Sequence, residues 1–376
     1  MRFGRKSVIL IFAAHSHSLK VRAERFVSLT MQALILAGGK GTRLRPLTVY
    51  TPKPVVPFCN RAFLLYQIEI LRKAGITDIT LSLSYQPDKI EHVLGNGSEY
   101  GVNLRFITEP APLGTGGAYR FAADGIEETT VVFNGDILTD FDIGRFVERH
   151  KQLGSVATLA LKPVENPSAY GLVETDSESR ILGFLEKPTD DQIEKLKINT
   201  INAGIYVLEP AILDLMPLGE NRSFEYDVFP EILKRGMPFY AGIMKEEYWR
   251  DIGTPASYLA AHQDFLRGAI KGFEVESSDL SDVATKATID SRSIIGEGCV
   301  IKPGARITNS VIGPGVQIEE KAIVEDSVLW AHSRISTAAE IRGSIIGRSC
   351  HIGRNAVVDQ GSVLVDKSTL TDYTRV

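Results

Sequence analysis

The stretch LILAGGKGTRLRPLTVYTPKP runs from Leu34 to Pro54 and sets a short apolar segment directly before three glycines. Arg43, Arg45 and Lys53 follow these glycines closely. Glycine lets a backbone approach an anion, and nearby cations add to the attraction. The stretch therefore predicts a strand that ends in an anion-binding loop.

Two familiar phosphate-binding motifs do not match this loop. A P-loop needs G-x-x-x-x-G-K-[ST], which no window of the stretch supplies. A dinucleotide fingerprint needs G-x-G-x-x-G, and here Gly39 and Gly41 fit while Leu44 occupies the third position. A tight turn without any ligand stays open as an alternative, although it does not account for three cations close behind it.

The chain from Met31 to about Arg267 alternates strand-like and helix-like segments. The expected strands are ALILAG, DITLSLSY, NLRFI, TVVFNGD, VATLALKP and AGIYVLEP. The expected helices are FLLYQIEILRKAG, GTGGAYRFAADG and DIGRFVERHKQLG. This alternation predicts an α/β fold with a Rossmann-like, mostly parallel sheet that is covered on both faces.

A second pattern begins at about residue 285, where aliphatic residues recur every seventeen positions with steps of six, six and five. The three series are Ile295, Ile312, Leu329, Ile346 and Val363; Ile301, Ile318, Ile335 and Ile352; and Ile307, Val324, Ile341 and Val358. Three inward residues per coil predict a triangular parallel β-helix of four complete coils, with Gly296, Gly313 and Gly347 at corners. The pattern resembles the left-handed β-helix of hexapeptide-repeat proteins.

Composition narrows the class of protein. The 376 residues carry a net charge of −4 and no basic block, so we expect no nucleic-acid partner. No apolar run reaches the length of a membrane span, and Cys59, Cys299 and Cys350 are too few for a disulfide framework. We expect a cytoplasmic protein whose cysteines are structural and whose His150 lies on the surface.

These patterns divide the chain into four parts. We expect an N-terminal extension over 1–30, the α/β domain over 31–267, a linker over 268–284 and the β-helix over 285–376. The extension has a basic start and an apolar patch, which fits either a signal or transit peptide or an upstream start codon. We favour the second interpretation, with Met31 beginning the folded domain.

The loop also belongs to a wider set of motifs. LAGGKGTRLRPLTVYTPKP resembles the signature of the sugar-nucleotide pyrophosphorylases, which transfer nucleotides to sugar-1-phosphates. The resemblance continues in order through EPAPLGTGGA, FNGDIL, PSAYGLVE, FLEKP, INAGIYVL, SFEYDVFPEIL and YWRDIGTPASYL. It covers residues 31 to about 265, and a β-helix is a common partner of this domain in the same family.

The resemblance implies a reaction without a protein nucleophile. A sugar-1-phosphate oxygen attacks the α-phosphorus of a nucleoside triphosphate and pyrophosphate leaves, so catalysis rests on positioning, cations and metal. Backbone amides of Gly38, Gly39 and Gly41, with Thr42, would hold the triphosphate. Arg43 and Lys53 would be the catalytic cations. Asp136 and Asp251 would complete the catalytic set by binding Mg²⁺.

The same resemblance implies the remaining contacts. Lys187 would bind the sugar phosphate, and Glu186, Asn202 and the backbone of Gly171 would bind sugar hydroxyls. The base would contact Glu109, Gly114, Leu36 and Ala37. Taken alone, each residue has a plainer interpretation: Asp136 as a cap, Lys187 as a surface lysine, Gly171 as a turn.

Within the family the motifs look closest to mannose-1-phosphate guanylyltransferases, which implies GTP and mannose-1-phosphate as substrates. One departure is NGD, where many enzymes of this type have NSD. Glucose-1-phosphate thymidylyl- or uridylyltransferases are the next alternative, and a non-catalytic regulatory homologue is a third. The uninterrupted coils argue against an added acyltransferase activity. We also expect a homo-oligomer.

Overall fold

The computed structural model describes residues 31–168, 170–185, 189, 191, 198–274 and 286–376. The predicted extension over 1–30 and most of the predicted linker lie outside the described residues. So do Glu186 and Lys187. Residues 31–376 belong to one compact unit.

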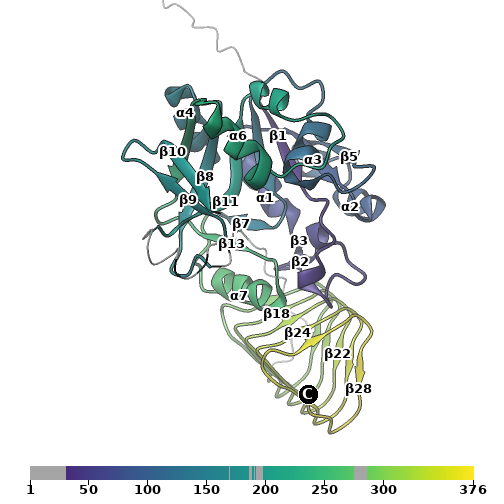
Figure 1. The fold of residues 1–376 in the computed structure, drawn as a ribbon. Helices are drawn as coiled ribbons and strands as arrows, with labels where there is room; N and C mark the ends of the chain where they lie inside the picture. The colour runs from purple at the N-terminus through teal and green to yellow at the C-terminus, as the bar shows by residue number, and fades with distance from the viewer. Residues whose placement is uncertain (1–30, 169, 186–188, 190, 192–197, 275–285) are drawn as a thin grey trace, which may run out of the picture. The chain divides into compact units, whose positions relative to one another are not determined.

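A nine-stranded sheet forms the centre of the first domain (Figure 1). Its parallel core has the order β6-β1-β4-β5, and antiparallel β11 extends it beside β6. The expected strands are confirmed as β1 Gln32–Leu36, β4 Asp78–Leu83, β5 Asn103–Thr108, β6 Thr130–Asn134, β8 Ala157–Pro163 and β11 Thr200–Leu208. Three more complete the sheet: β9 Leu172–Thr175, β10 Ile181–Leu185 and β12 Phe239–Ile243.

Helices cover both faces of this sheet, as predicted. Alternation along β1 explains why, since Ala33 and Ile35 pack into one hydrophobic cluster and Leu34 into another. The α-helices are α1 Leu64–Lys73, α2 Pro87–Leu94, α3 Gly114–Ala122, α4 Ile143–Leu153, α6 Phe229–Lys234 and α7 Pro255–Leu266. Short 3₁₀ segments are η1 Thr42–Leu44, η2 Lys53–Val55, η3 Ser98–Tyr100 and η4 Pro210–Leu215, and η5 Phe224–Val228 is a π-helix.

Two small ribbons lie outside the main sheet. Strands β7 Ile137–Thr139 and β13 Trp249–Asp251 pair antiparallel, with Asp251 opposite Ile137. Strands β2 Pro57–Phe58 and β3 Arg61–Ala62 form a second antiparallel pair. The first ribbon matters for the site because it joins two segments that are far apart in the sequence.

The second domain is a parallel β-helix, built from three sheets of five short strands each (Figure 1). One sheet holds β14 Thr288–Ile289, β17 Arg306–Thr308, β20 Ile323–Glu325, β23 Glu340–Arg342 and β26 Val357–Val358. The next holds β15 Ile294–Ile295, β18 Val311–Ile312, β21 Val328–Leu329, β24 Ile345–Ile346 and β27 Val363–Leu364. The third holds β16 Val300–Ile301, β19 Gln317–Ile318, β22 Arg334–Ile335, β25 His351–Ile352 and β28 Thr369–Leu370.

The seventeen-residue register holds through most of the β-helix and slips at its end. Val363 pairs with Ile345, and it is Leu364 that pairs with Ile346, so the prediction for Val363 was wrong by one position. The extra residue lies between Val358 and Leu364, in a turn where Gly361 has a φ of 87°. A turn absorbs an added residue more readily than a strand does, because a strand would invert its faces.

The corner glycines of the β-helix are explained by close packing between coils. A Cβ on Gly296 would lie 2.5 Å from the nitrogen of Pro314, and one on Gly313 would lie 2.6 Å from the nitrogen of Ala331. The Cβ of Gly347 would meet the nitrogen of Asp366 at 2.6 Å. The predicted corners are therefore confirmed, and the reason is the backbone of the next coil.

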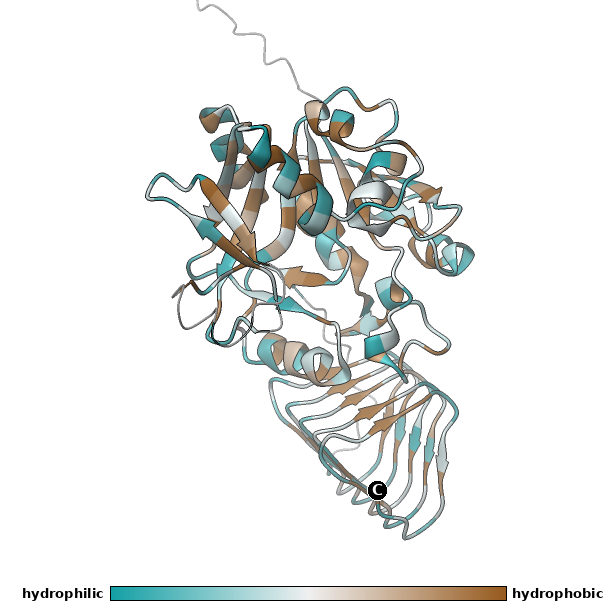
Figure 2. Cartoon of the chain, viewed as in Figure 1, coloured by the Kyte–Doolittle hydropathy of each residue, from teal (hydrophilic) through white to brown (hydrophobic). Residues whose placement is uncertain are grey.

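One face of the β-helix carries a second apolar row, which packs against the first domain. Ile294, Val311, Val328 and Ile345 precede the inward residues of their strands and share a hydrophobic cluster with Tyr258 and Ala261 of α7. Trp330 belongs to the same cluster, and its Nε1–H donates to the Tyr258 hydroxyl at 3.0 Å. Figure 2 shows hydrophobic residues on many strands of the main sheet and on the β-helix strands that lie nearest α7.

Two sequence-based expectations about single residues have different outcomes. The three cysteines are free and buried, as expected for structural residues. His150, expected at the surface, is 1% exposed. It lies on α4 between Thr158 and Glu209, whose side chains are 2.7 and 2.9 Å from its ring nitrogens.

Across the described part of the chain, no helix combines the length and the apolar character that a bilayer crossing requires.

Candidate active site

The glycine loop begins where β1 ends and is held by its neighbours in the sheet. The amide of Ala37 donates to the carbonyl of Ser82 at 2.9 Å, and the amide of Gly135 donates to the carbonyl of Leu36 at 2.9 Å. These bonds join the carboxyl ends of three adjacent strands, β4, β1 and β6. Ligands of α/β sheets bind at this edge.

Two glycines of the loop have no room for a side chain. Gly41 has a φ of 62°, and a Cβ there would lie 2.9 Å from the Cβ of Lys53. A Cβ on Gly38 would lie 2.9 Å from both Glu109 Oε1 and Ser84 Oγ. Gly39, in contrast, has no heavy atom within 4 Å of such a Cβ, so its surroundings are open.

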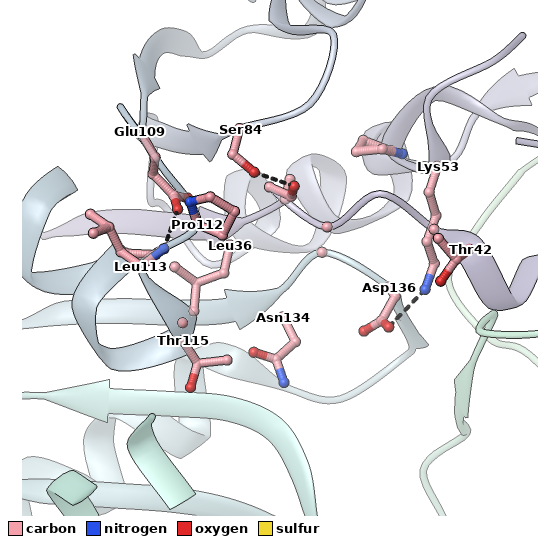
Figure 3. Close-up of a pocket in the computed structure, with 18 of the residues that line it drawn as sticks. Leu36, Thr42, Lys53, Ser84, Glu109, Pro112, Leu113, Thr115, Asn134 and Asp136 are labelled. Carbon is pink, nitrogen blue, oxygen red and sulfur yellow. Dashed lines mark hydrogen bonds and ion pairs between the residues drawn. The ribbon is translucent and has the colours of Figure 1, made fainter. Parts of the chain in front are cut away.

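A cavity of about 440 Å³ opens above this edge and collects most of the predicted residues. Its lining includes Leu36, Ala37, Gly38, Gly39, Gly41, Thr42, Arg43, Lys53, Glu109, Gly114 and Asp136. Figure 3 shows Glu109 and Leu113 on one side of the cavity and Lys53 with Asp136 on the other. Glu109, a predicted base contact, therefore lies at the opposite end from Lys53 and Asp136, two of the predicted catalytic residues.

Glu109 lies at one end of this cavity and is 8% exposed. The Ser82 hydroxyl donates to its Oε1 at 2.9 Å, and the Leu113 amide donates to its Oε2 at 3.2 Å. Burial raises the pKa of Glu109, while these two hydrogen bonds lower it. The carboxylate is thus fixed in place and keeps free lone pairs for a further donor.

The glycines after Glu109 are needed mainly for close packing. A Cβ on Gly114, which also has a φ of 72°, would lie 2.5 Å from the carbonyl oxygen of Arg222. The amide of Gly117 donates to the same oxygen at 3.0 Å. The first turn of α3 is therefore pressed against the 220–222 segment, which fixes the wall of the cavity.

Lys53 and Asp136 form the opposite end, with Lys53 Nζ 2.8 Å from Asp136 Oδ2. Asp251 is brought near them by the β7–β13 ribbon, because the amide of Ile252 donates to the carbonyl of Asp136 at 3.0 Å. Asp251 is not part of the cavity lining, although its neighbour Gly253 is. The two predicted metal ligands thus meet at one end of the ribbon: Asp251 is the last residue of β13, and Asp136 immediately precedes β7.

Arg43 approaches the same end. A Cβ on Gly253 would lie 2.8 Å from Asp251 Oδ2 and 3.1 Å from a terminal nitrogen of Arg43, so both side chains flank this glycine. Burial raises the pKa of Asp251 and the charge of Asp136 raises it further, while Lys53 and Arg43 act in the opposite direction. Two carboxylates and two cations therefore interact electrostatically here.

Asp136 and Asp251 are the candidate ligands for a metal ion at this end of the cavity. Among the described residues, no group of three or more His, Cys, Asp or Glu side chains is placed to hold one. Mg²⁺ is commonly held by one or two carboxylates, with phosphate oxygens and water as its other ligands. Asp136 and Asp251, whose mutual repulsion raises the pKa of Asp251, fit that requirement.

The predicted acceptor residues are only partly described. The amide of Asn202 donates to the carbonyl of Gly171 at 3.2 Å, so these two residues are neighbours. The Asn202 side chain donates to the Tyr206 hydroxyl at 2.9 Å and accepts from the amide of Gly204 at 3.1 Å. Neither Gly171 nor Asn202 lines the cavity, and Glu186 and Lys187 lie outside the described residues.

Several residues of the site were missed by the sequence analysis. Ser84, Thr115 and Asn134 line the cavity. The Tyr170 hydroxyl donates to Asp251 Oδ1 at 3.3 Å. Ser84 and Asn134 stand at or just after the ends of β4 and β6. Because ligands of α/β sheets bind at the carboxyl ends of strands, this position is the signal that could have found them.

Comparison with known proteins agrees with this geometry. The nucleotidyl transferase family matches residues 32–268, and the left-handed β-helix domain of the EIF2B epsilon subunit matches residues 276–376. The chain belongs to the nucleotidyl transferase family. Within it, the chain is a sugar-1-phosphate nucleotidyltransferase that carries a left-handed parallel β-helix.

Its relatives include mannose-1-phosphate guanylyltransferases. The Mycobacterium tuberculosis enzyme is 37% identical over 289 residues, covering 75% of this chain and 79% of its own. The Debaryomyces hansenii enzyme is 37% identical over 349 residues, covering 89% and 91%. A UTP–glucose-1-phosphate uridylyltransferase from Synechocystis is 33% identical over 362 residues, covering 89% and 92%.

A solved structure shares the fold. It is a Bacillus anthracis protein assigned as a glucose-1-phosphate thymidylyltransferase and crystallised with sucrose. The TM-score is 0.57 at 25% identity, and the match covers 65% of this chain and 98% of the other. The shared part is therefore close to the size of a complete nucleotidyltransferase.

Proposed function

We propose that the protein is a Mg²⁺-dependent mannose-1-phosphate guanylyltransferase, which converts GTP and mannose-1-phosphate into GDP-mannose and pyrophosphate. The observation that carries this proposal is the similarity to guanylyltransferases over about nine-tenths of the chain, as in the 89% covered by the Debaryomyces relative. The cavity adds support, because it holds a buried acceptor at one end and paired charges at the other.

The base end favours guanine on chemical grounds. Guanine presents two donors side by side, its N1–H and its 2-amino group, whereas uracil and thymine present one ring N–H. Glu109 is a carboxylate whose two oxygens each accept one protein hydrogen bond and keep capacity for another. A fixed carboxylate of this kind suits a base with two adjacent donors.

In the proposed mechanism, the chain brings two anionic substrates together and balances their charge. The glycine loop binds the triphosphate through backbone amides, as its lack of side-chain space at Gly38 and Gly41 allows. Arg43 and Lys53 neutralise the α-phosphate and the departing pyrophosphate, whose charge grows as the bond breaks. No side chain needs to form a covalent bond with either substrate.

Asp136 and Asp251 would hold Mg²⁺, which supplies additional positive charge to the phosphate oxygens when bound. Lys53 already contacts Asp136, so Lys53 and a bound Mg²⁺ would share that carboxylate. Gly171, Asn202, Glu186 and Lys187 remain the candidates for the sugar-1-phosphate. Their roles rest on the matching motifs PSAYGLVE, INAGIYVL and FLEKP.

A grid of substrates tests the proposal. GTP, dTTP, UTP, ATP and CTP are each combined with mannose-, glucose- and N-acetylglucosamine-1-phosphate, and pyrophosphate release is measured with Mg²⁺ and with EDTA. We expect the highest kcat/KM for GTP with mannose-1-phosphate and no turnover in EDTA. A clear preference for UTP or dTTP with glucose-1-phosphate would replace the substrate assignment.

The Synechocystis relative makes the uridylyltransferase the second candidate, since it matches 89% of this chain. A regulatory homologue that binds sugar nucleotide without turnover is the third. Sustained turnover with any pair excludes that third candidate. Binding of GDP-mannose without turnover of any pair would favour it.

A further inference from the structure

Gln67 lies on α1 with 1% of its surface exposed, among apolar residues of the domain core. Its Nε2 donates two hydrogen bonds, to the carbonyl of Asn134 at 3.0 Å and to the carbonyl of Ile137 at 2.8 Å. These carbonyls flank Gly135 and Asp136. One amide therefore joins the last residue of β6 to the first residue of β7, across the turn that carries Asp136.

The other half of this amide has no partner. Gln67 Oε1 is buried and accepts no hydrogen bond from any described residue. A buried polar atom without a partner destabilises a fold, and the flanking core residues of α1, such as Leu64 and Ile68, are apolar. An apolar residue would fill this position at lower cost, so the amide is best explained by what its two N–H groups hold.

The turn has further anchors, but no other side chain in the described part of the chain bonds to both of its ends. The amide of Gly135 donates to the carbonyl of Leu36, and a Cβ on Gly135 would lie 2.8 Å from that same oxygen. The carbonyl of Asp136 accepts from Ile252 at 3.0 Å. Gln67 adds a restraint at both ends of the turn, and so limits rotation of the backbone that aims the Asp136 carboxylate.

We propose that Gln67 is a positioning residue for nucleotidyl transfer. It holds the turn that carries Asp136, so that the Asp136 carboxylate keeps its position relative to Lys53 and Asp251. This inference rests on the proposed function, because it assigns importance to the orientation of Asp136. Gln67 itself touches neither substrate nor metal in this scheme. A misplacement of about 1 Å at a reacting centre costs on the order of 100-fold in rate.

Two substitutions reduce the number of donors while keeping the length of the side chain approximately the same. Gln67→Met presents no donor, and Gln67→Glu places a carboxyl group toward two carbonyl oxygens. Gln263→Met is the matched control, because Gln263 on α7 donates to the carbonyl of Asn309 at 3.2 Å, away from the cavity. If Gln67→Met is recovered unfolded, Gln67→His, which keeps one N–H donor, is measured in its place.

The kinetic test separates positioning from a general loss of stability. We expect Gln67→Met to lower kcat by roughly 10- to 100-fold and to raise the Mg²⁺ concentration needed for half-maximal rate, with KM for the sugar-1-phosphate changed less than 3-fold. A kcat and Mg²⁺ dependence equal to those of Gln263→Met, at a temperature where both variants are folded, would overturn the inference.

A second measurement does not depend on activity. Hydrogen exchange of the peptide covering 133–138 should be faster in Gln67→Met than in the wild type, with exchange in the β-helix unchanged. Wild-type protection of this peptide in the variant would overturn the inference whatever the kinetics. If the wild type turns over no substrate pair, the proposed function fails, and faster exchange would still show that Gln67 holds the turn.

Discussion

Lys53 Nζ lies 2.8 Å from Oδ2 of Asp136, although eighty-three residues separate the two in the sequence. The pair is partly buried, with side-chain exposures of 11% for Lys53 and 28% for Asp136. A cation is thus already in contact with the carboxylate that we assign to the metal. In the proposed mechanism, Lys53 and the metal ion would both place positive charge beside Asp136.

Replacing Lys53 with methionine should lower kcat by about 100-fold, because a fixed cation near the transferred phosphoryl group is lost. The Mg²⁺ requirement should stay the same or fall, since Asp136 then has no competing cation. Steady-state pyrophosphate release across a Mg²⁺ titration checks both effects. A higher Mg²⁺ requirement in this variant would contradict the shared role of Asp136.

Asp136→Asn and Asp251→Asn should each abolish most turnover, because each removes one carboxylate from the proposed metal site. Raising the Mg²⁺ concentration should recover part of the rate in both. Asp124→Asn serves as the control, since Asp124 is an exposed residue that pairs with Arg120. Near-wild-type activity in either site variant would refute the metal assignment.

Arg43→Ala should reduce kcat by roughly 100- to 1,000-fold while raising KM for the nucleotide far less, because the charge it balances grows as pyrophosphate leaves. Arg43→Lys should recover part of the loss. The measurement is a full steady-state analysis with both substrates varied. An increase in KM with an unchanged kcat would instead make Arg43 a simple binding residue.

Gly38→Ala should raise KM for the nucleotide about 10-fold or more, because the added Cβ would displace Glu109 or Ser84 from the cavity wall. Gly39→Ala is the matched comparison, as its Cβ meets no protein atom within 4 Å. Any increase in KM for the nucleotide in Gly39→Ala therefore reports contact between the added methyl group and bound substrate alone. An equal increase in KM in the two variants would mean that crowding against Glu109 and Ser84 does not cause the effect of Gly38→Ala.

His262 should make the protein less stable in mild acid. It is fully buried, its Nδ1 donates to the carbonyl of Tyr258 at 2.9 Å and its Nε2 accepts from the amide of Cys59 at 3.2 Å. Burial lowers the pKa of His262 to about 4. The unfolded chain therefore binds a proton near pH 6.5 while the folded chain does not.

Because only the unfolded chain binds this proton, acid favours unfolding. Stability is unaffected by His262 above about pH 6.5 and falls as the pH drops from there toward 4, by about 2 kcal/mol at pH 5. Urea unfolding at pH 7 and pH 5 measures it. His262→Gln should lessen the difference, while His92→Gln, at an exposed position on α2, should leave it as in the wild type. A wild-type protein equally stable at both pH values would disprove the prediction.

Much of the site could be predicted because it follows from strand ends. Leu36 and Asp136 stand at the carboxyl edge of the sheet, and periodic strands are readable from sequence. The metal-binding roles of Asp136 and Asp251 both came from the family resemblance. Asp136 follows the end of β6, whereas Asp251 is brought to the site by the β7–β13 ribbon, and no local pattern marks that pairing. Gln67 gave no signal, because a single polar residue in an apolar helix face looks the same with or without a role.

The prediction for His150 was wrong for a different reason, because the sequence did contain a signal for its burial. It follows Phe146 and Val147 by four and three positions on α4, and all three are buried. Residues three and four apart share a helix face, so its burial was implied by a pattern already in the sequence. The surface prediction for His150 relied on its residue type, whereas its spacing from Phe146 and Val147 along the helix predicts burial correctly.

The outward row consists of Ile294, Val311, Val328 and Ile345. Each coil contributes one residue to it, seventeen positions after the last, as in the inward rows. For this reason, the length of the β-helix can change without changing the surface through which it packs against α7. Removing or inserting a whole seventeen-residue coil keeps every later side chain on its own face, whereas one residue added or removed within a strand would turn the attaching row away from α7. Evolution or an engineer can therefore shorten or lengthen this domain in steps of one coil without redesigning the surface on which the catalytic domain rests.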